Sequence, residues 1–410
     1  MEQAESSQEN RTGNPVTAVL ILAHPPDTIL PGEWYQRTLA GVPFLLRNLL
    51  NLQKGGVERI VIYSPEPVAP ESDPLPALAR DSRIRCEVEW IPDWDSLHEV
   101  LRDSSSRLVV NGSALTDSAD VAALLNGSLD LERQGRVGYQ RVSRTDLRQW
   151  LPRLEVSGGT EPSPPPNPDS RDEAAAGIEL LAGGPETRVQ RDEDFRVQHE
   201  RLLTQGGMDS DSFMDRWVSR YFSRQFTRLL IDTPVTPNQI TWMNLAAGLG
   251  SAVLFYQGTY AMVVAGAMLL MISAWLDSTD GEVARLRFQQ SRYGMILDVI
   301  GDNVVHWAVF LGIGWGVAHM TGNSLYQVCG VLSMVGAMAS FGLLEASVFK
   351  KRSGAEYESS GWEDELANRD FLYFLFVMAL VDQLQLFIMI TAVGSNVFAG
   401  YVLYKKLKSS

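Results

Sequence analysis

The stretch DSTDGEVARLRFQQSRYGMILDVIGD, residues 277–302, places four carboxylates between two long apolar parts of the chain. Asp277 and Asp280 are three residues apart, and Asp298 and Asp302 are four apart, so each pair lies on one face of a helix. A short connection makes the two helices antiparallel neighbours. We therefore predict that both acidic pairs face one another at the same end of a helical hairpin.

Divalent cations would relieve the repulsion among these carboxylates, which would otherwise be partly protonated in a low-dielectric site. Ligands that are all oxygens favour Mg²⁺ or Mn²⁺. Gly294 extends the face of Asp298 by one turn, where the lack of a side chain lets a ligand or a helix come close. The alternative is that the carboxylates only cap helix ends and pair with nearby arginines, which are Arg285, Arg287 and Arg292.

Uncharged segments with the length of membrane spans lie on both sides of this stretch. They are Gln239–Gly258 (20 residues), Thr259–Leu276 (18), Asn303–Leu344 (42) and Gln383–Tyr404 (22). A span needs about 20 residues, so the longest segment is sufficient for two. Together with the short apolar segment Phe371–Val381, residues 238–410 are predicted to form a six-helix transmembrane bundle.

Basic residues lie on only one side of this predicted bundle. They precede the first span, separate spans two and three, separate spans four and five, and follow the last span. By the positive-inside rule, both termini then face the cytoplasm. Residues 213–237, which mix aromatic side chains with arginines, are predicted to form an amphipathic helix on the membrane surface, with a helix of the soluble part as the alternative.

Residues 1–155 alternate apolar strands with helices and are predicted to form a cytoplasmic α/β domain. The predicted strands are Val16–Ala23, Arg59–Tyr63, Ile84–Trp90 and Arg107–Val110, and the predicted helices are Pro43–Lys54 and Ser96–Arg102. This alternation is typical of a doubly wound, Rossmann-like parallel sheet. Residues 156–212, which contain EPSPPPNP, have the composition of a solvated linker.

Composition excludes several classes of protein. The 35 Lys and Arg residues against 49 Asp and Glu give a net charge of -14, which argues against a nucleic-acid partner. Two cysteines, Cys86 and Cys329, cannot form a disulfide scaffold or a cysteine-based zinc site. Residues 1–14 are polar and lack the apolar core of a secretion signal.

The acidic stretch satisfies every fixed position of D-x2-D-G-x2-A-R-x8-G-x3-D-x3-D, the signature of the CDP-alcohol phosphotransferases. The chain resembles this family, also called CDP-alcohol phosphatidyltransferases, over roughly residues 215–410, and TPNQIT at 236–241 is similar to the family's approach to its first span. The resemblance implies Mg²⁺- or Mn²⁺-dependent transfer of a substituted phosphoryl group from a CDP-alcohol to an acceptor alcohol, with release of CMP. It places this reaction in phospholipid or inositol-type phosphodiester biosynthesis, with two metal ions, a membrane lipid environment and a homodimer.

The same resemblance implies roles for individual residues. Asp277, Asp280 and Asp298 would hold the metals, and Asp302 would complete the metal site and act as base toward the incoming hydroxyl. The pocket for cytidine diphosphate would be lined by Gly281, Ala284, Arg285, Gly294, Asn238 and Thr241. From its position at the start of the fifth span, Arg369 is a candidate for acceptor binding, together with Arg292; the alternative is that Arg369 is only a membrane anchor paired with Asp370. A guanidinium grips a phosphate bidentately, so the acceptor would be a phosphorylated polyol.

The amino-terminal segments VLILAH (19–24) and RTLAGVPFLLRNLLNLQKGGVERIVIYS (37–64) resemble the opening of a sugar-phosphate nucleotidyltransferase. That family has a glycine-rich loop after its first strand, but here the only glycine between the strand and Arg37 is Gly32. Ser113 stands where the family has a metal-binding carboxylate. We therefore predict a degenerate nucleotidyltransferase-like domain, in which His24 is structural and Asp117 caps a helix.

Three alternative functions stay open. The segments DRWVSRYFSRQFTRLL (215–230) and NRDFLYF (368–374) make the layout similar to a subgroup in which an inositol-1-phosphate cytidylyltransferase is fused to a di-myo-inositol-phosphate-phosphate synthase, so the first domain could make the CDP-alcohol. An intramembrane prenyltransferase would normally carry its aspartate-rich motifs in two separate loops. A divalent-cation transporter would need a polar route, for which the spans offer only scattered candidates such as Asn244, His306 and Asn396.

Overall fold

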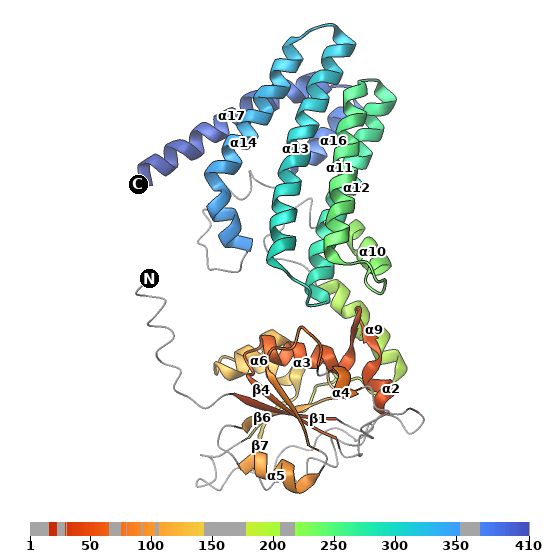
Figure 1. Ribbon diagram of the computed structural model, residues 1–410, viewed down its shortest axis with the longest axis vertical. Helices are drawn as coiled ribbons and strands as arrows, with labels where there is room; N and C mark the ends of the chain where they lie inside the picture. Colours follow the sequence, from red (N-terminus) through yellow and green to blue (C-terminus); the bar gives the residue numbers. More distant parts are fainter. Residues whose placement is uncertain are drawn as a thin grey trace. The chain divides into compact units, whose positions relative to one another are not determined.

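The computed structural model describes residues 16–22, 29, 31–64, 75–78, 80–91, 93–102, 106–142, 178–205, 218–352 and 370–409. The chain separates into two compact units, Met1–Leu202 (unit 1) and Leu203–Ser410 (unit 2) (Figure 1). Each unit is built around hydrophobic clusters of its own.

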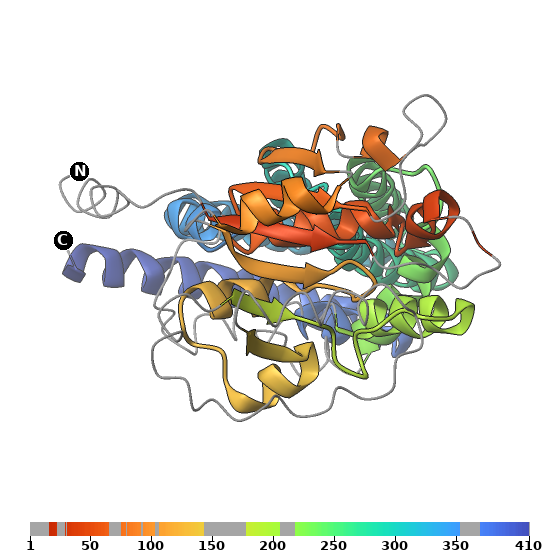
Figure 2. The same ribbon diagram turned by 90° about the horizontal axis from the view of Figure 1, so that it is seen from below.

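Unit 1 contains one six-stranded sheet in the order β5-β4-β1-β6-β8-β7 (Figure 2). The strands are β1 (Thr17–Ile21), β4 (Arg59–Tyr63), β5 (Glu87–Ile91), β6 (Ser106–Asn111), β7 (Tyr139–Val142) and β8 (Ile178–Leu181). All neighbouring strands are parallel except β7, which is antiparallel to β8. Because β1 lies inside the sheet and the chain winds outward from it to both edges, the predicted doubly wound α/β arrangement is confirmed.

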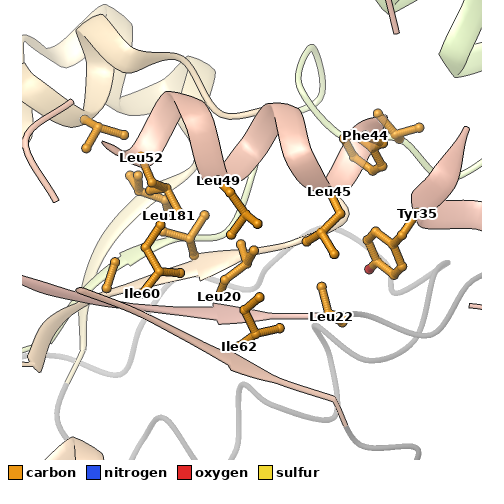
Figure 3. Packing of buried hydrophobic residues seen from close by; sticks show 14 of the residues in the cluster. Leu20, Leu22, Tyr35, Phe44, Leu45, Leu49, Leu52, Ile60, Ile62 and Leu181 are labelled. Carbon is orange, nitrogen blue, oxygen red and sulfur yellow. The ribbon is translucent and has the colours of Figure 1, made fainter. Parts of the chain in front are cut away.

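Helices cover both faces of this sheet because its inner strands are apolar on both faces. Leu20 of β1 packs beneath α3 (Phe44–Lys54) and α6 (Ser118–Leu125), whereas Ile21 faces the other way and packs with Leu97 of α5 (Trp94–Arg102). Figure 3 shows Leu45 and Leu49 of α3 lying over Leu20 and its neighbours. Continuously apolar strands are expected for a parallel sheet that is buried on both sides.

Shorter elements complete unit 1. They are α2 (Pro31–Gln36), β2 (Thr38–Leu39), β3 (Val42–Pro43), α4 (Leu75–Leu78), α7 (Leu131–Val137) and α9 (Asp192–Gln205). The buried guanidinium of Arg47 donates to the carbonyl oxygen of Leu39 at 2.8 and 3.1 Å and to that of Ala40 at 3.2 Å. Burial lowers the pKa of Arg47 to about 9. These bonds hold the turn between β2 and β3, where Ala40 and Gly41 both have positive φ.

The sheet continues beyond residue 155, where the sequence predicted that the domain ends. Strand β8 lies between β6 and β7, and helix α9 follows it. Both lie within residues 156–212, so the linker prediction is wrong for this part of the range. The strand has only four residues, and its partner β6 is distant in the sequence, so no local pattern distinguishes it. The proline-rich segment 161–168 lies outside the described residues.

Unit 2 is helical. Its helices are α10 (Arg220–Leu230), α11 (Pro237–Gln257), α12 (Tyr260–Leu286), α13 (Arg292–Thr321), α14 (Leu325–Arg352), α16 (Asp370–Leu380) and α17 (Leu384–Ser409). In the described part of the chain, four of them are long and apolar enough to cross a membrane, namely α12, α13, α14 and α17. The protein is therefore an integral membrane protein. Helices α11 and α16 form at the positions of the other two predicted spans.

Glycines let the helices of unit 2 approach closely. Gly312 and Gly316 of α13 face α11, so closely that a Cβ added at either would overlap a backbone carbonyl oxygen, of Ala252 and Phe255 respectively. Helix α11 packs along both α12 and α13. Small residues at such crossings are typical of membrane helices, whose association depends on close van der Waals packing.

Replacing Gly316 with Ala should destabilise unit 2, because the added Cβ would lie 2.0 Å from the carbonyl oxygen of Phe255. That oxygen is part of the α11 backbone and cannot rotate away, so we expect a loss of about 1–3 kcal/mol. Thermal unfolding in detergent should show a lower Tm, by roughly 2–4 °C for each kcal/mol.

Gly342→Ala is the matched control, since Gly342 is also helical but an added Cβ there meets nothing within 4 Å. Alanine is favoured over glycine in a helix by roughly 0.5–1 kcal/mol, so this variant should keep or raise the Tm. Equal losses of Tm in the two variants would contradict the tight contact between α13 and α11.

Candidate metal centre

Polar side chains of α11 pair with the acidic residues of α12. Oγ1 of Thr241 donates to the carboxylate of Asp280, and Nδ2 of Asn244 donates to Oδ1 of Asp277 at 3.2 Å. From the first pair to the second, the position moves three residues forward along α11 and three residues backward along α12, as expected for antiparallel neighbouring helices. All four side chains are at most 6 % exposed. The two helices therefore present the first acidic pair in one fixed register.

Three of the four predicted carboxylates come together. One oxygen from each of Asp277, Asp280 and Asp298 lies within 4.8 Å of the other two. Asp298 comes from α13, and α12 and α13 both pack along α11. Asp302 lies one turn further along α13, is half-buried, and is not part of this group. The predicted convergence of the two helices is therefore present for three of the carboxylates.

The donor set fits a hard divalent cation. All three groups are carboxylates, Asp277 and Asp280 are buried, and Asp298 is half-buried. Anionic oxygens in this number are the ligands that Mg²⁺ and Mn²⁺ prefer. Without positive charge among them, three carboxylates this close together in a membrane protein would be strongly unfavourable.

Gly294 lies where α13 begins, against the beginning of α11. A Cβ added at Gly294 would lie 2.7 Å from Oδ1 of Asn238 and 3.0 Å from Oγ of Ser291. Ser291 caps α13 by accepting a hydrogen bond from the Gly294 amide at 2.9 Å. Thr236 caps α11 in a reciprocal capping box with Gln239. These caps fix where both helices start, so Asn238 and Gly294, which were predicted from separate motifs, are neighbours.

The remaining predicted residues lie near the acidic group or outside the described chain. Arg285 places its guanidinium beside Gly281, with Nη1 3.3 Å from the position of an added Cβ. Ala284 and Arg285 are half-buried, and Arg292 is exposed at the first residue of α13. Arg369 lies outside the described residues.

The sequence reasoning missed Glu282, which joins α12 to the helix before the first span. Its carboxylate accepts hydrogen bonds from Oγ of Ser223 at 3.1 Å and from Oγ1 of Thr227 at 2.6 Å, both on α10. Phe222 of α10 also stacks on Trp275 of α12, with ring centroids 3.9 Å apart. The sequence signal that could have indicated this contact is the spacing of Ser223 and Thr227, which lie four residues apart in an arginine-rich helix. Helix α10 therefore packs in unit 2, and not as a helix of the soluble unit.

The role of Arg287 was also missed, because the sequence presented it only as a topological charge or as a partner of the aspartates. Its guanidinium donates to four backbone carbonyl oxygens in the turn between α10 and α11, which belong to Leu230, Ile231, Thr233 and Val235. A cation is favourable at the carboxyl end of a helix, where carbonyl groups lack partners. Arg287 thus holds the segment that leads into Thr236 and Asn238.

Unit 1 uses its candidate residues in internal contacts. Arg37 forms an ion pair with Asp192 of α9, and its guanidinium carbon lies 5.3 Å from the ring centroid of Trp34 and 5.5 Å from that of Phe195. Ser113 is buried, with its Oγ 3.3 Å from the hydroxyl of Tyr35.

Two further predictions concern single residues of unit 1. Asp117 caps α6, as predicted, by accepting a hydrogen bond from the amide of Ala119 at 2.8 Å. His24 lies outside the described residues.

Comparison with known proteins agrees with this geometry. Residues 234–398 match the model of the CDP-alcohol phosphatidyltransferase family. Unit 2 therefore carries a domain of this family, which contains the signature residues and the acidic group described above.

Individual relatives are similar to parts of this chain. The chain is 33% identical over 242 residues to the bifunctional IPC transferase and DIPP synthase of Rubrobacter xylanophilus, which covers 58% of this chain and 50% of that protein. It is 30% identical over 128 residues to the phosphatidylinositol phosphate synthase of Mycobacterium tuberculosis, covering 30% of this chain and 58% of that one. The chain spans half or less of the length of the bifunctional relatives that it matches.

Among solved structures, the M. tuberculosis phosphatidylinositol phosphate synthase with CDP-DAG bound is similar at 20% identity and a TM-score of 0.35. The similarity covers 46% of this chain and 92% of that one.

Proposed function

We propose that unit 2 transfers a substituted phosphoryl group from a CDP-alcohol to an acceptor alcohol and releases CMP. The observation that carries the proposal is the group of Asp277, Asp280 and Asp298, whose oxygens lie within 4.8 Å of one another. These are three fixed positions of the family signature, and the family model covers all of them. The fourth signature aspartate, Asp302, lies one turn away on α13.

In this proposal the carboxylates divide into two roles. Asp277, Asp280 and Asp298 would hold the divalent cation, with Asp302 available for a second ion. Bound Mg²⁺ or Mn²⁺ would supply charge neutralisation for the diphosphate and for the departing CMP. Asp302 would accept the proton of the acceptor hydroxyl while the hydroxyl oxygen forms a bond to the phosphorus that carries the donor's alcohol. The bond from that phosphorus to the CMP oxygen then breaks, and CMP leaves with the electron pair.

Residues near the acidic group would bind the donor. The half-buried guanidinium of Arg285, lying beside Gly281, offers a positive charge to the diphosphate. Asn238, Ala284 and Gly294 would complete the nucleotide pocket. Thr241, also proposed for the pocket, donates to Asp280, so its contribution would include orienting that carboxylate.

Asp298→Asn should abolish CMP release while the protein still inserts and folds, because a neutral amide is a much poorer ligand than a carboxylate for Mg²⁺. The measurement is CMP formation by purified protein with CDP-diacylglycerol or CDP-inositol and a panel of acceptors. Loss of such a ligand should cost several kcal/mol, so turnover should fall to less than about a tenth of wild type.

Asp382→Asn is the matched control, since it makes the same chemical change in the turn between α16 and α17. Asp382 has a φ of 57°, which asparagine also adopts readily. Wild-type turnover in Asp298→Asn would refute the ligand role, and equal losses in both variants would point to a general folding defect.

We propose that unit 1 does not make the CDP-alcohol, in contrast to the bifunctional alternative that the names of several relatives suggest. Arg37, which stands where the nucleotidyltransferase family commonly has a lysine, forms an ion pair with Asp192. Ser113, at the position expected for a metal carboxylate, is buried against Tyr35. A separate cytidylyltransferase reaction would then have to supply the donor.

The full-length Asp298→Asn variant, given CTP, Mg²⁺ and phosphorylated alcohols, should release no pyrophosphate above background. The transfer proposed for unit 2 releases CMP and not pyrophosphate, so pyrophosphate reports on unit 1 alone, and the variant prevents consumption of any CDP-alcohol that forms. An authentic cytidylyltransferase added to the same assay is the positive control. Pyrophosphate release that depends on the phosphorylated alcohol would overturn the proposal and establish the bifunctional alternative.

The acceptor is proposed to be a phosphorylated polyol, such as inositol phosphate or glycerol phosphate, bound by Arg369 with help from Arg292. Arg369→Lys should raise the acceptor KM about tenfold, equivalent to about 1.4 kcal/mol, because lysine cannot form the bidentate contact. The KM for the CDP-alcohol should change little. Arg352→Lys is the control, because Arg352 belongs to the basic residues 350–352 between predicted spans four and five, whose expected role is only to set the orientation. Unchanged acceptor kinetics in Arg369→Lys, or a preference for an unphosphorylated alcohol, would contradict this assignment.

We also propose six spans with both termini in the cytoplasm, and a homodimer. The one-sided distribution of basic residues supports the orientation. To test the orientation, single cysteines can be placed near Lys405 and labelled in sealed vesicles. A reaction from the extracytoplasmic side alone would contradict the proposed orientation. Cross-linking in membranes that yields only monomer would contradict the dimer.

A further inference from the structure

We infer that Asn244 and Ser273 are positioning residues that hold the Asp277 carboxylate in the orientation required to bind the cation. The inference rests on the proposed metal-dependent function and adds two residues that lie outside the family signature. Oγ of Ser273 donates toward Oδ1 of Asn244, and Nδ2 of Asn244 donates to Oδ1 of Asp277 at 3.2 Å. The three side chains form a continuous chain of hydrogen bonds that crosses from α12 to α11 and back.

Chemistry allows only one orientation of the Asn244 amide. Nδ2 faces the Asp277 carboxylate, which can only accept hydrogen bonds when ionised. The reversed amide would place two oxygens against each other in a buried site. The Ser273 hydroxyl lies near both Oδ1 and the backbone carbonyl oxygen of Asn244, 3.1 Å from the latter, and so anchors Asn244 from the α12 side, whereas the Asp277 carboxylate decides the orientation of the amide.

Because these three side chains are buried, the loss of one of their hydrogen bonds is not easily compensated by water. Asn244 is 4 % exposed, Ser273 is 2 % and Asp277 is 6 %. Water does not readily replace a lost donor in such a place, so without the Asn244 amide the carboxylate of Asp277 could rotate about its χ angles. Outer partners that orient a ligand in this way usually contribute 10- to 100-fold to metal affinity.

A purely structural role would predict a different outcome. If the Asn244–Asp277 bond only joined α11 to α12, its loss would lower stability and leave the affinity for the cation unchanged. If the bond orients the ligand, cation affinity falls by more than the change in stability explains. Mn²⁺ binding, read by electron paramagnetic resonance of the free ion, separates the two roles and requires no substrate.

The experiment compares full-length wild type, Asn244→Leu and Ser273→Ala in detergent. We expect Asn244→Leu to weaken Mn²⁺ binding about tenfold or more and Ser273→Ala to weaken it by a smaller factor. Two controls lie elsewhere in the same unit. Asn396→Leu removes a membrane amide that bonds only the carbonyls of Leu332 and Ala392, and Ser251→Ala removes a buried hydroxyl that bonds the carbonyl of Gly248. Both should bind Mn²⁺ as wild type does, whatever happens to their Tm.

The outcomes distinguish this inference from the function on which it rests. Wild-type Mn²⁺ affinity in both Asn244→Leu and Ser273→Ala would overturn the positioning role and leave the metal site intact. An absence of saturable Mn²⁺ binding in wild type would overturn the metal site itself, and the inference with it. If Asn244→Leu fails to fold, Ser273→Ala alone decides, since removing one hydroxyl leaves the helix contact almost unchanged.

Discussion

The burial of carboxylates between membrane helices is the constraint on which unit 2 depends. Burying the carboxylates of Asp277 and Asp280 is unfavourable unless hydrogen-bond donors accompany them, and the donors come from Thr241 and Asn244 one helix away. This pairing requires one register between α11 and α12. The close contacts of Gly312 and Gly316 then bring α13 against α11, and with it Asp298. Helix packing and the acidic group are therefore two aspects of one arrangement, because a shift of a single turn would separate each carboxylate from its donor.

Much of this arrangement could be predicted from spacing alone. Pairs of acids three and four residues apart must share a helix face, and uncharged segments of about 20 residues must be helical in a bilayer. The partners could not be predicted in the same way. Asn244 was noticed only as a scattered polar residue, Glu282 not at all, and Arg287 only as a topological charge or a partner of the aspartates, since each acquires its role from a helix distant in the sequence. In unit 1 the parallel sheet followed from its alternating pattern, whereas β8 did not, because so short a segment, with only three apolar residues, becomes a strand only through pairing with β6.

Unit 1 is a stable fold whose polar residues are used for its own cohesion. Arg47 donates hydrogen bonds to the carbonyl oxygens of the β2–β3 turn. Arg37 forms an ion pair with Asp192 and lies over two aromatic rings. A nucleotide site needs cations that remain open to a triphosphate, and these two are already engaged. The sheet and its covering helices depend on apolar packing and not on the polar residues at the strand ends, so this fold can persist without a nucleotide site.

The pattern of internal hydrogen bonds also separates the proposed transferase from a cation transporter. A transport route needs polar groups that face water or ions along the length of the spans. The polar residues that could have formed one are engaged elsewhere: Asn244 donates to Asp277, Asn396 donates to two backbone carbonyls, and His306 packs edge-on against Phe371. The acidic group can hold a cation in place for a substrate that arrives from one side, which is what a phosphoryl transfer at the membrane surface requires.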